Sequence, residues 1–144
     1  MSDSQELTSF LAKVPLLRGL NSRQLRGIAQ STTRRTYAEG EEIVTQGDAG
    51  IGLYIILSGE AEAVHTRSNG EKVVVNTFGI TDFFGELAML SEEPRTASVI
   101  ATAETECLIL TRWEFLGKFK ADSEMAVVIL QELARRFQRA LGVL

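Results

Sequence analysis

The sequence predicts an α+β fold in which N-terminal and C-terminal helices flank a double-stranded β-roll, a jelly-roll-like antiparallel barrel. Two changes in the spacing of apolar residues predict it: the period is helical over residues 1–31, strand-like over residues 32–111 and helical again over residues 112–144. At 144 residues the chain is long enough for one sizeable core and too short for two domains of ordinary size. We therefore expect a single domain over residues 1–144.

The N-terminal segment predicts two short helices. Leu7, Phe10 and Leu11 lie on one face of the first helix, because residues three or four apart are neighbours on a helix surface. Asn21 or Ser22 is placed to cap the second, since both side chains accept hydrogen bonds from the first amides of a helix.

Short strands fill the middle of the chain, where valine and isoleucine alternate with glycine or asparagine breaks. The strand-like segments are TYAEGEEIVTQGD, GLYIILSGEAEAVH, EKVVVNTF and TASVIATAETECLIL. Many short strands at this spacing are typical of a barrel, roll or sandwich. The Asn-Gly pair within residues 68–70 predicts a tight hairpin.

The C-terminal segment predicts a short helix at RWEFLGKF and a longer one capped by Asp122 or Ser123. Apolar residues at threes and fours form one stripe on the longer helix, and plain packing, a homodimer seam and contact with an effector domain or protein partner are open for it. We call these residues the C-terminal stripe: Val127, Leu130, Leu133, Ala134, Phe137 and Leu141.

Composition excludes several classes of function. The net charge of −4 argues against direct binding of nucleic acid or of an anionic membrane, and no apolar segment approaches the roughly 20 residues of a membrane-spanning helix. The start MSDSQELTSF lacks the features of a signal peptide, and the single cysteine cannot form an internal disulfide. We expect a cytoplasmic protein.

The sequence also offers no catalytic constellation. His65 is the only histidine, whereas a cupin-type metal site on a β-roll needs a cluster of histidine and carboxylate ligands. We predict that Cys107 is a small buried hydrophobe and that Trp113 and Phe115 pack in the core. We therefore expect no enzymatic activity, no metal and no cofactor.

The stretch FFGELAMLSEEPRTASV, residues 83–99, predicts an anion site. Gly85 permits a positive φ or a close backbone approach, and the ELAML after it consists of good helix formers. A helix beginning there leaves the amides of Glu86, Leu87 and Ala88 without intrahelical partners, and such amides attract an anion.

Arg95 follows Pro94, which ends that helix and places the arginine behind the same loop. A guanidinium matches two phosphate oxygens, and Glu86 would be compatible with a nearby anion if it accepted hydrogen bonds from hydroxyl groups. A sugar phosphate satisfies both residues. The alternative is a surface ion pair between Glu86 and Arg95, worth about 0–1 kcal/mol.

The same stretch resembles the phosphate-binding cassette of the cyclic-nucleotide-binding domain family, of the catabolite activator protein, protein kinase A regulatory subunit and cyclic-nucleotide-gated channel type. QGDAGIGLYIILSGEAEAV resembles the glycine-spaced strand signature of that family, in which Gly47 and Gly59 shape turns. The resemblance covers almost the whole chain. It implies a regulatory module that binds cyclic AMP or cyclic GMP.

The resemblance assigns roles residue by residue. The amides after Gly85, including those of Leu87 and Ala88, and the side chain of Arg95 would hold the exocyclic phosphate oxygens. Glu86 would accept the ribose 2'-hydroxyl.

Four further residues would bind the base or adjoin it: Val75, Ala63, Thr96 and Ala97. Thr96 stands where cyclic-GMP-selective relatives carry threonine, but other relatives with a small hydroxyl residue there prefer cyclic AMP, which we favour. The chain departs from the family at Thr81, a glycine position, where the turn is expected to differ. Ala61 and Ala63 replace bulkier valines.

In this family the helices after the roll move when nucleotide binds, and a residue of the last helix covers the base. Here Phe137 or Leu141 would cover it, or Arg135 or Arg136 would stack on it. The alternative function is a degenerate roll that has lost its ligand and acts in protein interaction or dimerisation.

Overall fold

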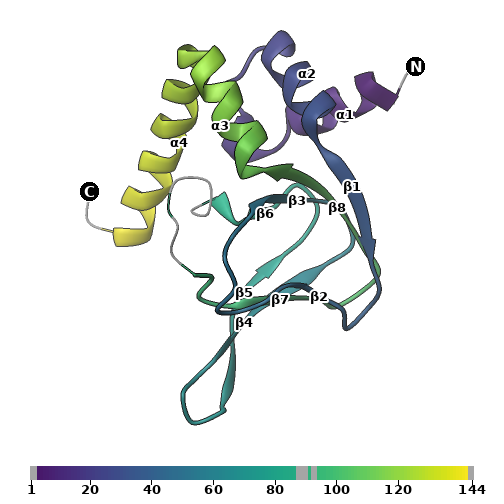
Figure 1. Ribbon diagram of the computed structural model, residues 1–144, viewed down its shortest axis with the longest axis vertical. Coiled ribbons are helices and arrows are strands. Elements are labelled where there is room, and N and C mark those ends of the chain that lie inside the picture. Colours follow the sequence, from purple (N-terminus) through teal and green to yellow (C-terminus); the bar gives the residue numbers. More distant parts are fainter. Residues whose placement is uncertain (1–2, 87–90, 92–93, 143–144) are drawn as a thin grey trace. The chain divides into compact units, whose positions relative to one another are not determined.

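The computed structural model describes residues 3–86, 91 and 94–142. The described chain forms two compact units: a helical unit of residues 3–31 and 113–142, and a roll unit, Thr32–Arg112 (Figure 1). A single domain over residues 1–144 stays a prediction.

The helical unit contains five helical segments. They are α1 (Asp3–Leu11), the 3-10 helix η1 (Pro15–Leu17), α2 (Ser22–Ser31), α3 (Arg112–Ala121) and α4 (Ser123–Leu141). Among the described residues, each helix falls short of the length and apolar character needed to cross a bilayer.

Both predicted caps are confirmed. The Asn21 side chain accepts a hydrogen bond from the Gln24 amide, and the Gln24 side chain accepts one from the Asn21 amide, each at 2.9 Å. Asp122 accepts one from the Met125 amide at 3.1 Å and another from the Gln24 side chain at 3.0 Å. The bond from Gln24, followed by that from Met125, lowers the pKa of Asp122. The starts of α2 and α4 are therefore joined through side chains.

The aromatic residues of α3 differ from expectation at one position. Phe115 is buried and meets Phe119 edge-on, but Trp113 is 72% exposed, so the core prediction is wrong for Trp113. Two residues apart on a helix point about 200° apart, and one side of α3 cannot bury both.

The buried face of α4 is also not the one that its apolar spacing suggested. Met125, Ile129 and Glu132 are buried, whereas four members of the C-terminal stripe are 48–65% exposed. The exposed members are Val127, Leu130, Phe137 and Leu141. Simple packing therefore does not account for them.

The roll unit consists of two four-stranded antiparallel sheets, which confirms the β-roll (Figure 1). One sheet has the order β1 (Thr33–Tyr37), β8 (Thr105–Thr111), β3 (Gly52–Ser58) and β6 (Phe83–Phe84). The other has the order β2 (Glu42–Val44), β7 (Ser98–Ala101), β4 (Ala61–Thr66) and β5 (Lys72–Phe78). As described, the two sheets are not hydrogen-bonded into one closed barrel.

Apolar side chains from both sheets form one core inside the roll. Cys107 is fully buried there, and burial raises the pKa of its thiol to about 12, as suits a packing residue rather than a nucleophile. The other members of the core cluster are Tyr37, Ile43, Val44, Tyr54, Ile56, Ala61, Ala63, Phe84, Val99 and Ala101.

The predicted hairpin joins β4 to β5. The Gly70 amide donates to the Arg67 carbonyl at 2.9 Å, and the Arg67 amide donates to the Glu71 carbonyl at 2.8 Å. Gly70 has φ of 89°, as expected where a hairpin turn ends in the left-handed region. The strand pairing slips once, leaving Val75 as an extra residue between the partners of Ala63 and Val64.

Thr81 lies in the turn that precedes β6. Its φ is 72°, and every other described non-glycine residue has a negative φ. The Thr81 amide donates to the Ile56 carbonyl, and the Ile56 amide donates to the Asp82 carbonyl. These two bonds fix the turn to β3. A β-branched residue at positive φ is strained. The turn thus keeps the backbone of a glycine at a position occupied by threonine.

We expect Thr81→Gly to raise the free energy of unfolding by up to about 2.5 kcal/mol. Relief of backbone strain of about 1–3 kcal/mol exceeds the extra freedom that glycine gives the unfolded chain, about 0.4–1 kcal/mol. Urea denaturation measures the difference. The control, Thr77→Gly within β5, should lower stability, and an equal loss in both variants would contradict strain at Thr81.

Candidate ligand-binding site

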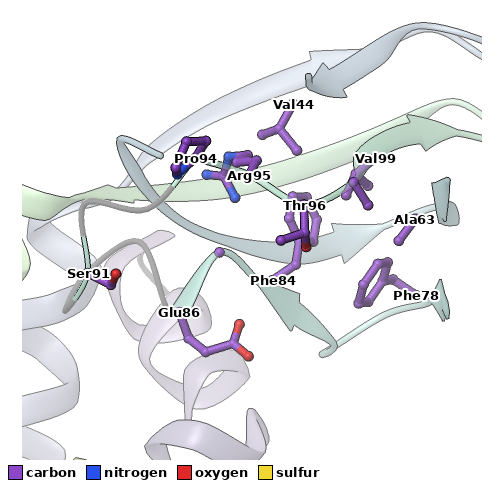
Figure 2. Close-up of a pocket in the computed structure, with 12 residues that line it drawn as sticks. Val44, Ala63, Phe78, Phe84, Glu86, Ser91, Pro94, Arg95, Thr96 and Val99 are labelled. Carbon is purple, nitrogen blue, oxygen red and sulfur yellow. The ribbon is translucent and has the colours of Figure 1, made fainter. Parts of the chain in front are cut away.

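A cavity of about 670 Å³ opens in the roll unit (Figure 2). Glu86 and Arg95 are its charged lining residues among those described, and most of the remaining wall is apolar. The other lining residues are Val44, Ala63, Phe78, Phe84, Gly85, Ser91, Pro94, Thr96, Ala97 and Val99.

The main chain of Arg95 is held from one side by the turn after β2. The Arg95 amide donates to the Asp48 carbonyl at 2.9 Å, and the Gly47 amide donates to the Arg95 carbonyl at 2.8 Å. Ala49 and Pro94 form a bridge beside these bonds. Gly47 has φ of 89°, which agrees with its predicted role in shaping a turn.

The side chain of Arg95 is fixed against β3. Its Nη2 donates to the Gly52 carbonyl at 3.2 Å, and its guanidinium carbon lies 5.6 Å from the centre of the Tyr54 ring. Burial lowers the pKa of Arg95, while Tyr54 and Glu86 oppose that shift. An arginine nevertheless stays charged at neutral pH, and its guanidinium has more N–H donors than this one bond uses.

Gly85 is required by space as well as by conformation. Its φ is 86°, and a Cβ there would lie 2.5 Å from the Gly52 carbonyl oxygen and 3.1–3.2 Å from the two terminal nitrogens of Arg95. Real Cβ atoms essentially never approach another atom to 2.5 Å. The absence of a side chain at Gly85 therefore allows β6, β3 and the guanidinium to meet.

Aromatic rings continue the wall away from Arg95. The Tyr54 and Phe84 rings stack in parallel with their centres 5.1 Å apart, and Phe78 tilts against Phe84 at 5.2 Å. Ala63 and Val99 complete this apolar end (Figure 2). The cavity therefore has a charged end and an end suited to a flat ring.

Several predicted site residues meet at this cavity: Gly85, Glu86, Arg95, Thr96, Ala97 and Ala63. Leu87 and Ala88 lie outside the described residues. Val75 is 57% exposed and is not among the described lining residues. The pairing slip on β5 falls at this residue, so Val75 stands outside the regular alternation of that strand, and its contact with the base stays a prediction.

The lining residues Phe78 and Phe84 escaped the sequence analysis, as did Gly52 and Tyr54, which contact Arg95 from outside the described lining. Gly52 and Tyr54 belong to a strand that was recognised, but nothing in its pattern shows that Arg95 contacts that strand. Phe84 directly precedes Gly85, and that adjacency was a usable signal. Phe78 ends β5, and only the folding of the sheet brings it to Phe84.

Figure 2 shows the Glu86 carboxylate and the Arg95 guanidinium apart from each other. The hydrogen bond described for the Arg95 side chain goes to the Gly52 carbonyl. This geometry favours a binding site over a surface ion pair. A β-roll whose mostly apolar cavity carries one arginine and one glutamate among the described residues defines a protein class suited to a small organic anion that carries a ring and hydroxyl groups.

The comparison with known proteins names that class. The model of the cyclic nucleotide-binding domain matches residues 34–122, and the chain belongs to this family. A cAMP-dependent protein kinase regulatory subunit of Mycosarcoma maydis is 36% identical over 135 residues, which are 94% of this chain and 22% of that protein. The chain spans only 22–27% of the length of the curated relatives it matches first.

Solved structures give the same assignment. The catabolite activator protein of Thermus thermophilus is 32% identical with a TM-score of 0.78, covering 88% of this chain and 59% of that one. The regulatory domain of Toxoplasma gondii protein kinase A, in a co-crystal structure with cAMP, is 28% identical with a TM-score of 0.80. That match covers 94% of this chain and 50% of the other.

We expect Gly85→Ala to destabilise the protein by about 1–3 kcal/mol more than Gly70→Ala. Both glycines have nearly the same positive φ, but a Cβ at Gly70 meets nothing within 4 Å. Subtracting the two urea-denaturation results removes the shared backbone strain and leaves the contact with Gly52 and Arg95. Equal losses would mean that this contact is not tight.

Proposed function

We propose that this chain binds a 3',5'-cyclic purine nucleotide, cyclic AMP in preference to cyclic GMP, as a regulatory sensor module. The observation that carries the proposal is the half-buried guanidinium of Arg95 beside Gly85 at the charged end of the cavity. A ligand with one negative charge and a flat heterocycle matches both ends. Family membership supplies the kind of ligand.

In this proposal the cyclic phosphate lies against Arg95 and the loop after Gly85. The amides of Leu87 and Ala88 are expected to donate to its oxygens, as the family resemblance implies. Glu86 accepts the ribose 2'-hydroxyl, which gives its carboxylate a role that does not oppose the phosphate. The base lies along the ring of Phe84 and the small side chain of Ala63.

The preference for cyclic AMP is supported by the relatives. The curated relatives from Mycosarcoma maydis and Blastocladiella emersonii are both described as cAMP-dependent, and the Toxoplasma gondii domain was crystallised with cAMP. Thr96 lines the cavity, where its hydroxyl is available to either base. Small residues at Ala63 and Ala97 leave room beside the base.

Occupancy is transmitted, in this proposal, by movement of the C-terminal helices toward an effector domain or a protein partner in the cytoplasm. A ligand shifts such an equilibrium only by its difference in affinity between the two states. Phe137 or Leu141, or a stacked Arg135 or Arg136, would cover the base. The chain itself carries out no catalysis and contacts neither nucleic acid nor membrane directly.

One observation favours the second candidate function, a roll without ligand that dimerises or binds a protein. The exposed members of the C-terminal stripe, with Ala134, follow the three-four spacing of a helix–helix seam. A 26% identical regulatory subunit from Trypanosoma brucei is described as belonging to a cAMP-independent kinase. The presence of Glu86 and Arg95 together speaks against a degenerate site.

We expect Arg95→Ala to lose about 2–5 kcal/mol of cyclic AMP binding, a weakening of about 30-fold or more, because the phosphate loses its charged partner. Calorimetry at micromolar protein measures it. Arg35→Ala is the matched control, since Arg35 also lies over a tyrosine, 5.3 Å from the Tyr37 ring centre. Its affinity should not change.

Two results would overturn the nucleotide proposal in different ways. Unchanged affinity in Arg95→Ala means that the phosphate binds elsewhere. Failure of the wild-type chain to bind either cyclic nucleotide, together with a dimer in sedimentation that Leu130→Glu dissociates, supports the second candidate function.

Base preference gives a separate expectation. Thr96→Ala should weaken cyclic GMP binding about 3- to 10-fold, the effect of one lost hydrogen bond to the guanine amino group, and change cyclic AMP affinity less than about 2-fold. Competition of both nucleotides against a fluorescent analogue measures this. Thr36→Ala, on exposed β1, is the control. Equal effects on both nucleotides would show that Thr96 does not distinguish the bases.

A further inference from the structure

The Arg95 segment leaves the sheet at a fork between β4 and β7. These strands pair from Ala61 opposite Ala101 to Val64 opposite Ser98, and the described ladder stops there. Had it continued in register, Thr66 would face Thr96. Instead, the main chain of Arg95 pairs with Gly47 and Asp48 on the other side.

The side chains of Gln46 and Ser98 make hydrogen bonds at this fork. The Gln46 side chain donates to the Thr66 carbonyl at 2.9 Å and accepts from the Thr66 amide at 2.8 Å, so both main-chain groups of Thr66 are engaged. The main-chain amide of Gln46 donates to the Ser98 hydroxyl at 2.9 Å. Gln46 thereby connects the last residue of β4 to the first residue of β7 and holds the fork open.

His65 bonds the departing segment itself. Its Nδ1 lies 2.7 Å from the Thr96 carbonyl oxygen. A carbonyl only accepts, so Nδ1 must carry the proton. The bond fixes the peptide that joins Thr96 to Ala97, one residue beyond Arg95.

We propose that His65 is a positioning residue of the nucleotide site, which holds the Thr96 carbonyl through Nδ1–H and so sets the direction in which Arg95 enters the cavity. Gln46 acts with it by keeping β4 from pairing with this segment. His65 does not line the cavity among the described residues and acts on the ligand only through Thr96 and Arg95. This inference rests on the proposed function.

The substitutions His65→Leu and His65→Asn isolate the donor. Both replacements branch at Cγ, but only asparagine places an N–H donor near the position of Nδ1. We expect His65→Leu to weaken cyclic AMP binding about 3- to 10-fold and His65→Asn to remain within about 2-fold of wild type, as measured by calorimetry. Arg67→Gln, which removes only a surface ion pair with Glu71 in the same hairpin, should bind as wild type does.

The opposite pattern would overturn the inference: wild-type affinity in His65→Leu, or equal weakening in the leucine and asparagine variants. A second measurement uses the ligand-free wild-type chain and needs no substitution. Nitrogen NMR of the neutral imidazole should find the proton on Nδ1, and a proton on Nε2 contradicts the hydrogen bond. If wild type binds no cyclic nucleotide, the proposed function fails, whereas the NMR result still decides the geometry of His65.

Discussion

The meeting of three backbone and side-chain groups organises the roll unit: the Gly52 carbonyl on β3, the left-handed Gly85 after β6 and the guanidinium of Arg95. Each group restricts the other two. The carbonyl accepts from the guanidinium, and the missing side chain at Gly85 lets both approach. An arginine held in this way enters a binding event with its direction already set, so less conformational entropy is lost when an anion arrives.

The arginine is supported from both of its neighbours in the chain. Pro94 forms a bridge to Ala49, and the Thr96 carbonyl meets His65. Tyr54 contacts both the Arg95 guanidinium and the Phe84 ring, which links the charged end of the cavity to its apolar end. Strand β3 thereby supports both ends through Tyr54.

Local patterns predicted the parts of the fold that depend on local chemistry. The caps at Asn21 and Asp122 and the hairpin at Gly70 follow from side chains that bond their own neighbourhood, so sequence was sufficient. The cassette was identified through its resemblance to a family motif. Trp113 was misplaced because the rotation of a helix depends on packing partners far along the chain. Val75, which the resemblance placed at the base, stands at a one-residue slip in strand pairing and outside the described lining. The contact of Arg95 with Gly52 likewise joins segments that no short pattern connects.

The Asp122 carboxylate serves two elements at once, because it caps α4 through Met125 and receives the Gln24 side chain at the start of α2. Any shift of the first turn of α4 that preserves these bonds also moves the beginning of α2. The N-terminal helices would then move together with the C-terminal helix, so a displacement of α4 would reach both the N-terminal and the C-terminal segments of the chain.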